Sequence, residues 1–229
     1  MIAKKILQTS KDRQPKHVTR QLKNLCGTDW KYSHYTDAEV ADYFQNNALD
    51  EFPLILKRFN QMPTGAHKAD LFRYYYLFIE GGVFIDSDAM PLVPLDEISV
   101  GCDFFSVSSH HAADMIFQGF IGAKPGSQII YEALMDAYTM DPEDLRNDYF
   151  RICRNLHAII EAHKTEAKGR IRIFREDRFH KGAAKIMDDS NKIILLHYHD
   201  RTFPPRFPLV NMVRGAISAA VRTITHPRL

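Results

Sequence analysis

Two aspartates that are separated by one residue, Asp86 and Asp88, follow a short apolar run at residues 83–85. In an extended chain, alternation puts both carboxylates on one side and Ser87 on the other. Neighbouring carboxylates raise each other's pKa unless a positive charge lies between them, and Mg²⁺ and Mn²⁺ prefer such oxygen ligands. These ions usually keep phosphate oxygens or waters in their remaining positions. The spacing therefore indicates a metal–diphosphate site at a strand end, although Asp-Ser-Asp is also an ordinary turn sequence.

The residues before this pair predict the elements that would position it. Residues 69–79 carry apolar side chains at i, i+4 and i+7, which predicts a helix with one apolar face. Gly81 and Gly82 end this helix, because glycine adopts positive φ without a steric cost. The apolar run at 83–85 is β-branched at two of its three positions and predicts a buried strand. The predicted unit is a helix, a glycine turn and a strand that ends at the two aspartates.

The same unit carries a longer motif. It contains Ala69-Asp70-Leu71-Phe72-Arg73-Tyr74, followed by Gly81-Gly82-Val83-Phe84-Ile85-Asp86-Ser87-Asp88. This composite resembles Ala-Asp-x-x-Arg-Tyr and Gly-Gly-x-Tyr-x-Asp-x-Asp in the sugar-binding region with the DXD motif of the family 32 glycosyltransferases. The glucosyltransferase domains of the large bacterial cytotoxins share the pattern. A bare DXD is a weak signal, whereas the composite is specific.

The resemblance implies an enzyme that moves a sugar from a nucleotide diphosphate sugar to an acceptor hydroxyl, with retention of the anomeric configuration. It implies that Mn²⁺ or Mg²⁺ bridges the two phosphates and stabilises the leaving diphosphate. Asp88 would bind the metal directly, and Asp86 would contact the ribose, or the metal through water. Asp70 and Arg73 would hold the donor sugar. Without such a role, these two residues would form an i, i+3 ion pair worth only ~0.2–0.5 kcal/mol.

The resemblance also implies roles for residues elsewhere in the chain. The implied catalytic residues are Asp70, Arg73 and Asp88. The implied donor-binding residues are Gln8, Thr9, Asp70, Arg73, Tyr74, Asp86 and Gln118. Two positions depart from the family pattern. Ser10 stands where a tryptophan stacks on the nucleotide base in the related toxins, and Gln118 stands where an asparagine contacts the donor sugar.

A second metal-binding signal lies far along the chain, where residues 192–198 predict an apolar strand that ends in His197-Tyr198-His199. In metal-dependent transferases of the implied fold, a late histidine often completes the metal site. We therefore expect the metal ligands to be Asp86, Asp88 and His197, with His199 as the second choice. Alternation lets both histidines point the same way. The competing interpretation is an ordinary strand end at the surface.

Length and composition favour one soluble domain over residues 1–229, with 45% hydrophobic and 25% charged residues. The order strand, helix, strand, helix at the start of the chain predicts an α/β fold. With the resemblance, it predicts a GT-A-like domain that has a mostly parallel central sheet flanked by helices, with the DXD at a strand end. A net charge of +2 gives no nucleic-acid footprint, so we expect no nucleic-acid partner.

Cysteine usage and the N-terminal residues bear on location. Cys26, Cys102 and Cys153 lie far apart, in no zinc or redox spacing, and are expected as reduced, buried thiols. Residues 1–10 lack the apolar core of a signal peptide. No apolar run approaches the ~20 residues of a membrane span. We therefore expect a cytoplasmic protein.

Residues 209–225 predict an amphipathic C-terminal helix with arginines beside one apolar face. The apolar face consists of Val210, Val213, Ile217, Val221 and Ile224. One interpretation is a terminal helix packed on the core. The other is a peripheral contact with the inner face of an anionic membrane, where each basic residue contributes ~1 kcal/mol. Such a contact would suit a glycan or glycolipid acceptor.

Two further patterns concern the second half of the chain. Residues 142–167 predict one helix, whose apolar face contains Leu145, Tyr149, Ile152, Leu156 and Ile159. His110 and His111 lie on a loop between two predicted strands at 103–108 and 115–122. Paired histidines on a loop could bind a metal ion, but they are more often simply solvated.

Two other functions are compatible with the sequence. A phosphatase of the haloacid dehalogenase type also places Asp-x-Asp after an apolar strand, with Asp188-Asp189 as its later acidic pair. Against it, Ala89-Met90 follows the aspartates where threonine or valine is expected, and the strand lies near residue 86 instead of opening the chain. The departures at Ser10 and Gln118 leave a non-catalytic sugar-nucleotide binder as the third class.

Overall fold

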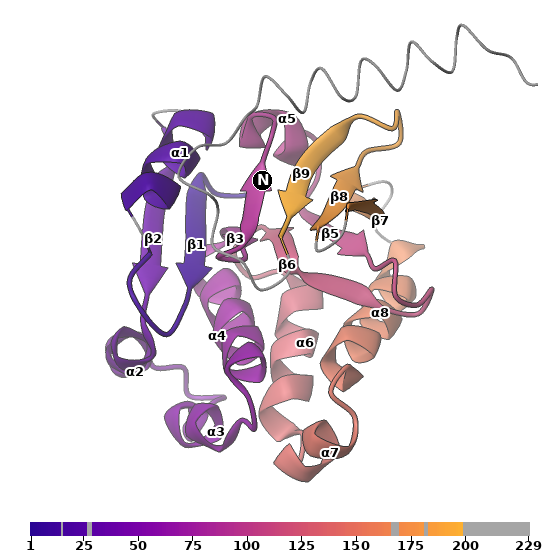
Figure 1. The fold of residues 1–229 in the computed structure, drawn as a ribbon. Helices are drawn as coiled ribbons and strands as arrows, with labels where there is room; N and C mark the ends of the chain where they lie inside the picture. The colour runs from indigo at the N-terminus through magenta and orange to yellow at the C-terminus, as the bar shows by residue number, and fades with distance from the viewer. Residues whose placement is uncertain (15, 27–28, 166–169, 181–182, 199–229) are drawn as a thin grey trace, which may run out of the picture.

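The computed structural model describes residues 1–14, 16–26, 29–165, 170–180 and 183–198, and these residues form an α/β fold, as the sequence predicts (Figure 1). The strands are β1 (Lys5–Thr9), β2 (Lys31–Tyr35), β3 (Gly82–Ile85), β4 (Ala89–Pro91), β5 (Phe104–Ser108), β6 (Ile116–Ala123), β7 (Ile171–His180), β8 (Ala183–Met187) and β9 (Ile193–His197). The helices are α1 (Lys16–Cys26), α2 (Asp37–Asn46), α3 (Ile55–Gln61), α4 (Gly65–Glu80), α5 (Leu95–Ser99), α6 (Gln128–Thr139), α7 (Pro142–Asn147) and α8 (Arg151–Lys164).

Some predictions fall outside these ranges. His199 and the predicted helix at 209–225 lie outside the described residues, so both stay predictions, as does the single domain over residues 1–229. Within the described part of the chain, every helix is too short or too polar to cross a membrane.

One nine-stranded sheet joins the described strands in the order β2-β1-β3-β6-β5-β7-β8-β9-β4. The pairs β1–β2, β1–β3 and β5–β7 are parallel, whereas β3–β6, β5–β6, β7–β8, β8–β9 and β4–β9 are antiparallel. The prediction of a mostly parallel sheet is therefore wrong. Helices connect β1 to β2, β2 to β3 and β6 to β7, whereas the hairpins β5–β6, β7–β8 and β8–β9 can join only antiparallel strands.

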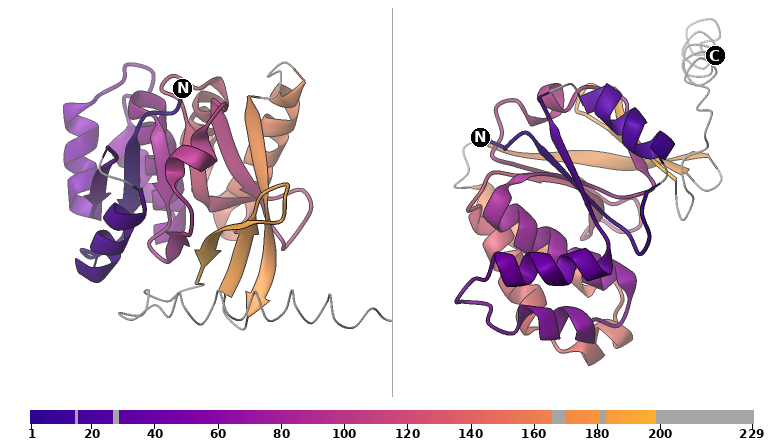
Figure 2. Two further views of the ribbon diagram at one scale, coloured as in Figure 1. Left: turned by 90° about the horizontal axis from the view of Figure 1, so that it is seen from above. Right: turned by 90° about the vertical axis from the view of Figure 1, so that its left-hand side faces the viewer.

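Apolar side chains pack on both faces of this sheet. One core contains Leu7 and Phe84 and lies under α2, α3, α4, α6 and α8. The other contains Ile6, Val83 and Ile85 and lies under α1 and α5. Figure 2 shows these helices on opposite sides of the sheet. A strand that is buried on both faces has a continuous apolar sequence, which explains the run at residues 83–85.

The helix before the two aspartates is confirmed and longer than predicted. Helix α4 begins after Thr64, whose hydroxyl accepts a hydrogen bond from the backbone N–H of His67 at 3.3 Å. It ends at Gly81 and Gly82, which have φ of 62° and 106°. A Cβ on Gly82 would lie 2.5 Å from the carbonyl oxygen of Lys5, so glycine is required for β3 to pack this closely on β1.

The single helix predicted at 142–167 is instead two helices, α7 and α8, that are separated at Asp148. Asp148 has φ of −142° and ψ of 86°, which ends the first helix. The break turns the chain, so residues on either side no longer share one helical face. Leu145, Ile152 and Leu156 are buried as predicted, but Tyr149 is 48% exposed.

Candidate active site

Strand pairing brings His197 to the two aspartates. Asp86 and Asp88 lie between β3 and β4, and Ala89 of β4 pairs with His197 of β9. The backbone N–H of Tyr198 donates to the carbonyl oxygen of Asp88 at 2.9 Å. As a result, one ligand atom each of Asp86, Asp88 and His197 lies within 4.8 Å of the others. The sequence predicted these three residues as metal ligands, and the structure places them together.

The chemistry of this cluster fits a hard divalent cation. Two carboxylates and one imidazole are ligands that Mn²⁺ and Mg²⁺ accept. The Nε2 atom of His197 lies 3.6 Å from Oδ1 of Asp88. Ligand atoms that all bind one ion at ~2.0–2.2 Å must lie within about 4.4 Å of one another, close to the observed limit. Small side-chain adjustments would therefore suffice for all three residues to bind the same ion.

Arg73 of α4 connects the helix to this cluster. It is only 3% exposed, and its guanidinium lies 3.2 Å from the carboxylate of Asp70 and 3.5 Å from that of Asp86. It also donates to the backbone carbonyl of Gln118 on β6 and lies over the ring of Phe84, 4.0 Å from the centroid. Asp70 and Arg73 are therefore a buried pair with several partners, and not the surface ion pair that was the competing interpretation.

Burial shifts the proton affinities of the two carboxylates beside Arg73. Burial raises the pKa of Asp70, although the charges of Arg73 and His67 oppose this. Burial also raises the pKa of Asp86; Arg73 and His197 oppose the shift, and the negative charges of Asp88 and Asp70 add to it. A cation bound between Asp86 and Asp88 would favour the charged carboxylates and lower these pKa values.

Glu176 of β7 is a buried carboxylate in this site that the sequence analysis missed. Its Oε1 lies 3.5 Å from Nδ1 of His197, and its Oε2 lies 2.9 Å from Nδ1 of His110. Oε2 also accepts hydrogen bonds from the hydroxyl of Ser109 and the backbone N–H of His110, both at 3.2 Å. His110 is thus an anchor for Glu176 and is not among the clustered metal-ligating residues of the described chain.

Glu176 and His197 shift each other's protonation. Burial would raise the pKa of Glu176, but its hydrogen bonds with His197 and His110 lower it to about 2. Burial would lower the pKa of His197, but its interactions with Asp88 and Glu176 raise it to about 9. Because Glu176 lies at Nδ1, the Nε2 atom of His197 is directed toward Asp88 and is the nitrogen placed to bind a metal.

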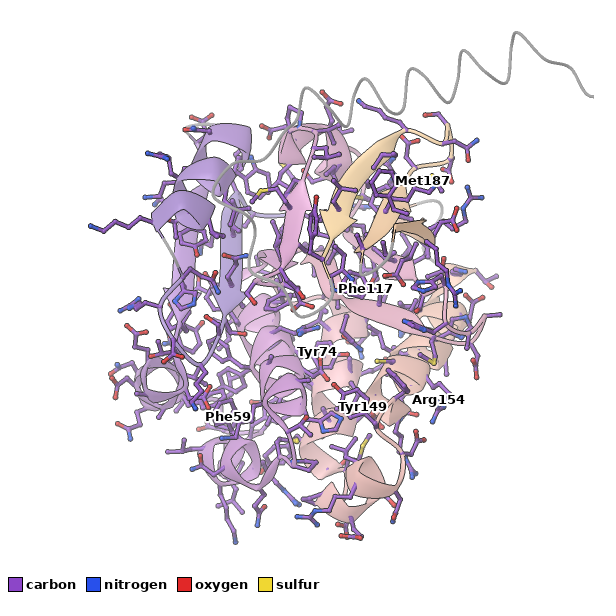
Figure 3. All side chains as sticks on the ribbon, in the orientation of Figure 1. Phe59, Tyr74, Phe117, Tyr149, Arg154 and Met187 are labelled. Carbon is purple, nitrogen blue, oxygen red and sulfur yellow. The ribbon has the colours of Figure 1, made fainter. Side chains whose placement is uncertain are left out.

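Two of the predicted donor-binding residues, Gln8 and Tyr74, lie in the protein interior. Gln8 is fully buried: its Nε2 donates to the carbonyl of Asp86 at 3.0 Å and its Oε1 accepts from Tyr32 at 2.9 Å. The hydroxyl of Tyr74, also fully buried, donates to Oε1 of Gln118 at 2.8 Å. Gln8 and Tyr74 therefore support Asp86 and Gln118 from the protein interior through these hydrogen bonds. Figure 3 shows Tyr74 near the centre of the molecule, inside the helical layer.

Two neighbouring clefts meet along α4. The first, about 490 Å³, is lined by the loop after β1, by α2 and α3 and by the start of α4, and includes Thr9 and Ser10. The second, about 440 Å³, contains Asp70, Arg73, Asp86, Asp88, Gln118, Glu176 and His197. Ala69 lines both clefts. A Cβ on Gly119 would lie 2.3 Å from Oδ2 of Asp86, so glycine is required there for the carboxylate to keep its place.

The pair Asp188-Asp189, proposed for a phosphatase, does not line the second cleft. Asp188 lies in the turn between β8 and β9, where its carboxylate accepts hydrogen bonds from the backbone N–H groups of Ser190 and Lys192 at 2.9 Å each. These contacts are ordinary turn chemistry.

Comparison with known families decides the nature of the region around the two aspartates. Residues 5–105 match the model of the family described as "Glycosyltransferase sugar-binding region containing DXD motif". This part of the chain is therefore similar to the DXD-containing sugar-binding region of glycosyltransferases. The predicted resemblance is thereby confirmed, while the roles of single residues stay predictions. Asp70, Arg73, Asp86 and Asp88 lie inside the match, whereas Gln118, Glu176 and His197 lie beyond it.

Two curated relatives are similar to part of this chain. The initiation-specific alpha-1,6-mannosyltransferase of Saccharomyces cerevisiae is 35% identical over 68 residues, which is 30% of this chain and 14% of that protein. The protein of the same name from Candida albicans is 37% identical over 67 residues, 29% of this chain and 17% of that protein. The matches therefore span less than a fifth of either relative. Among solved structures, the PaToxG glycosyltransferase has a TM-score of 0.48 and 15% identity, covering 73% of this chain and 71% of that one.

Arg73 provides the first test of the site. Arg73→Met should destabilise the protein by about 3–5 kcal/mol, because it leaves the buried carboxylate of Asp70 and the part-buried carboxylate of Asp86 without their counter-charge. Arg13→Met should cost at most about 1 kcal/mol, because Arg13 pairs with Glu39 at an exposed position. Urea denaturation measures both changes. An Arg73→Met protein as stable as the wild type would show that the guanidinium does not balance these carboxylates.

Glu176 provides the second test. Glu176→Gln removes the negative charge behind His197 and should weaken Mn²⁺ binding about tenfold or more, as loss of an outer partner of a metal-bound histidine usually does. The matched control is Glu132→Gln, because Glu132 lies 3.0 Å from His163 but does not line the second cleft. Electron paramagnetic resonance titration of free Mn²⁺ gives the affinity directly. Equal Mn²⁺ affinity in Glu176→Gln and in the wild type would contradict this role.

Proposed function

We propose that this chain is a metal-dependent glycosyltransferase that moves a sugar from a nucleotide diphosphate sugar to an acceptor hydroxyl, with retention of configuration. The observation that carries the proposal is the cluster of Asp86, Asp88 and His197, which shares one cleft with Arg73 and Asp70. The similarity of residues 5–105 to the sugar-binding region of glycosyltransferases supports the same reaction class.

The residues that line the second cleft would have different roles in the reaction. Asp86, Asp88 and His197 would hold Mn²⁺ or Mg²⁺, which when bound supplies positive charge that stabilises the leaving diphosphate. Arg73 keeps both Asp70 and Asp86 in place and presents a guanidinium near the position of a donor phosphate. The carboxylate of Asp70, which Arg73 keeps in place, would accept hydrogen bonds from hydroxyls of the donor sugar.

The two clefts suggest how the donor lies. We place the diphosphate and sugar in the second cleft, with the metal ligands, and the nucleoside in the first. Thr9 and Ser10 line the first cleft, together with two cations, Lys11 and Lys68, and one carboxylate, Asp37, which pairs with Lys68. Phe59 and Phe72 also border this cleft, but they are 3% and 0% exposed and so do not replace the missing tryptophan at Ser10. The donor would cross from one cleft to the other at Ala69, which both share.

The names of the relatives, which are mannosyltransferases, concern the transferred sugar and the kind of reaction. A glycan acceptor, free or carried on a lipid, is our proposal and does not follow from these names. The proposed cytoplasmic location and the membrane contact of residues 209–225 rest on the sequence alone, since that segment lies outside the described residues.

The test uses nucleotide diphosphates and their sugars. Asp88→Asn should leave the fold intact and abolish the rise in melting temperature that Mn²⁺ together with UDP or GDP gives the wild type, since a ligand that binds the folded state stabilises it. Asp188→Asn is the matched control and should behave as the wild type. Release of the nucleoside diphosphate from a panel of nucleotide sugars then separates an enzyme from a non-catalytic binder.

Three results would contradict the proposal. The first is an unchanged melting response in Asp88→Asn. The second is hydrolysis of a generic phosphate ester that Asp188→Asn abolishes, which would favour the phosphatase. The third is Mn²⁺-dependent binding of a nucleotide sugar without any turnover in the presence of glycan acceptors.

A further inference from the structure

Two exposed aromatic side chains lie inside the second cleft. Tyr149 and Phe150 are consecutive in the chain, are 48% and 42% exposed, and both line the cleft that contains Asp70 and Asp88. The other large hydrophobic side chains that are exposed in the described chain do not line it; these are Met1, Leu54, Val100 and Phe179. Single exposed apolar residues need no explanation, but an adjacent aromatic pair in a polar cleft does.

This pair is held in place and is not a loose surface loop. Tyr149 and Phe150 occupy the break between α7 and α8, and their rings lie 5.0 Å apart at 90°. His67 of α4 bonds through Nε2 with the carbonyl of Tyr149 at 3.0 Å, and its ring lies 4.9 Å from the Tyr149 ring. On the other side, the guanidinium of Arg154 pairs with Asp148. The helix that carries Asp70 and Arg73 therefore also positions the aromatic pair.

The pair lies away from the proposed nucleoside site. The first cleft does not include Tyr149 or Phe150, whereas Phe59 lines it. Figure 3 shows Phe59 toward α3 and Tyr149 toward α7 and α8. With the nucleoside in the first cleft and the diphosphate at Asp86 and Asp88, the aromatic pair faces the part of the second cleft that the donor leaves to the acceptor.

The side chains around Tyr149 and Phe150 in the second cleft suit a bound sugar ring. A pyranose has one face of C–H groups and a rim of hydroxyls. Flat aromatic rings offer apolar surface to the C–H face, and the hydroxyls need polar partners nearby. The cleft supplies both, since Tyr149 and Phe150 share it with the imidazole of His111, whose ring lies 6.4 Å from that of Phe150. A polypeptide acceptor would need an extended groove, whereas one sugar ring fits the remaining part of a cleft of about 440 Å³.

We propose that Tyr149 and Phe150 form the acceptor subsite and that the acceptor is a glycan whose terminal pyranose ring lies on these two side chains. This inference rests on the proposed transferase function, because it assigns the second substrate of the same cleft. The pair binds and orients the acceptor sugar so that one of its hydroxyls faces the donor at Asp86 and Asp88. It does not bind the nucleotide.

The test measures saccharide binding separately from nucleotide binding. The probes are isomaltotriose, α-1,6-mannotriose and triacetylchitotriose, each followed by saturation-transfer-difference NMR with the full chain. The wild type should bind at least one of them. Tyr149→Ala with Phe150→Ala should weaken that binding about tenfold or more, as loss of aromatic anchors usually does. Tyr149→Trp should retain it, because the flat ring is kept.

Two controls keep the result interpretable. Phe179→Ala removes an equally exposed aromatic outside the cleft and should leave saccharide binding unchanged. The melting response to Mn²⁺ and nucleoside diphosphate should be normal in the double variant, which shows both that it is folded and that its donor site is intact. The proposed function can then fail while the subsite stands, if a saccharide binds at the pair but no nucleotide binds at Asp88.

Three outcomes would overturn the inference. The first is that none of the three trisaccharides binds the wild type. The second is that the double variant, folded by its circular dichroism, binds a trisaccharide as well as the wild type does. The third is that the double variant loses affinity for the nucleoside diphosphate, in which case the aromatic pair holds the nucleobase and not the acceptor.

Discussion

The site depends on one buried guanidinium, that of Arg73. Arg73 is 3% exposed and contacts groups from three elements: Asp70 on its own helix, Asp86 at the end of β3 and the backbone of Gln118 on β6. A buried guanidinium with such partners is stable only while they remain, and the carboxylates have the same need of it. Together with the apolar residues of α4 that pack against the sheet, these contacts tie the helix to the strands that carry the site.

The charges of the second cleft explain why a cation should be needed for the donor. Asp70, Asp86, Asp88 and Glu176 line the cleft together with Arg73 and His197. Hydrogen bonds keep Glu176 ionised, and burial raises the pKa values of Asp70 and Asp86. A diphosphate would meet carboxylates at this place and be repelled. A divalent cation between Asp86 and Asp88 reverses the local sign of the charge, so metal binding should precede or accompany donor binding.

The parts of this account that were predictable from the sequence are local ones. The helix, the glycine turn, the buried strand and the paired aspartates each depend on spacings of a few residues. His197 was predictable because it ends an apolar strand, although its partner β4 is only three residues long. By contrast, the directions of the strands after β3 were not predictable from such local spacings, because they depend on whether a hairpin or a helix connects each strand to the next. The β8 strand escaped notice because Ala183–Met187 has few of the residues that favour strands.

Glu176 and Tyr149 were missed for different physical reasons. Glu176 lies in a strand in which charged residues are frequent, and nothing in its neighbourhood marks it as the one that turns inward onto two histidines. Tyr149 fits the apolar face of one continuous helix, and only the break at Asp148 exposes it. Both depend on contacts between segments that are far apart in the sequence, such as the bond between His67 and Tyr149.

Binding of one metal ion by Asp86, Asp88 and His197, next to Arg73, can be measured by anomalous diffraction at the manganese edge, from crystals of the chain grown with Mn²⁺ and a nucleoside diphosphate. We expect one strong peak within bonding distance of all three side chains, with phosphate density that extends toward Ala69 and the first cleft. A peak bound by other residues, or phosphate density with no manganese between it and Asp88, would show that these three residues do not form the metal site.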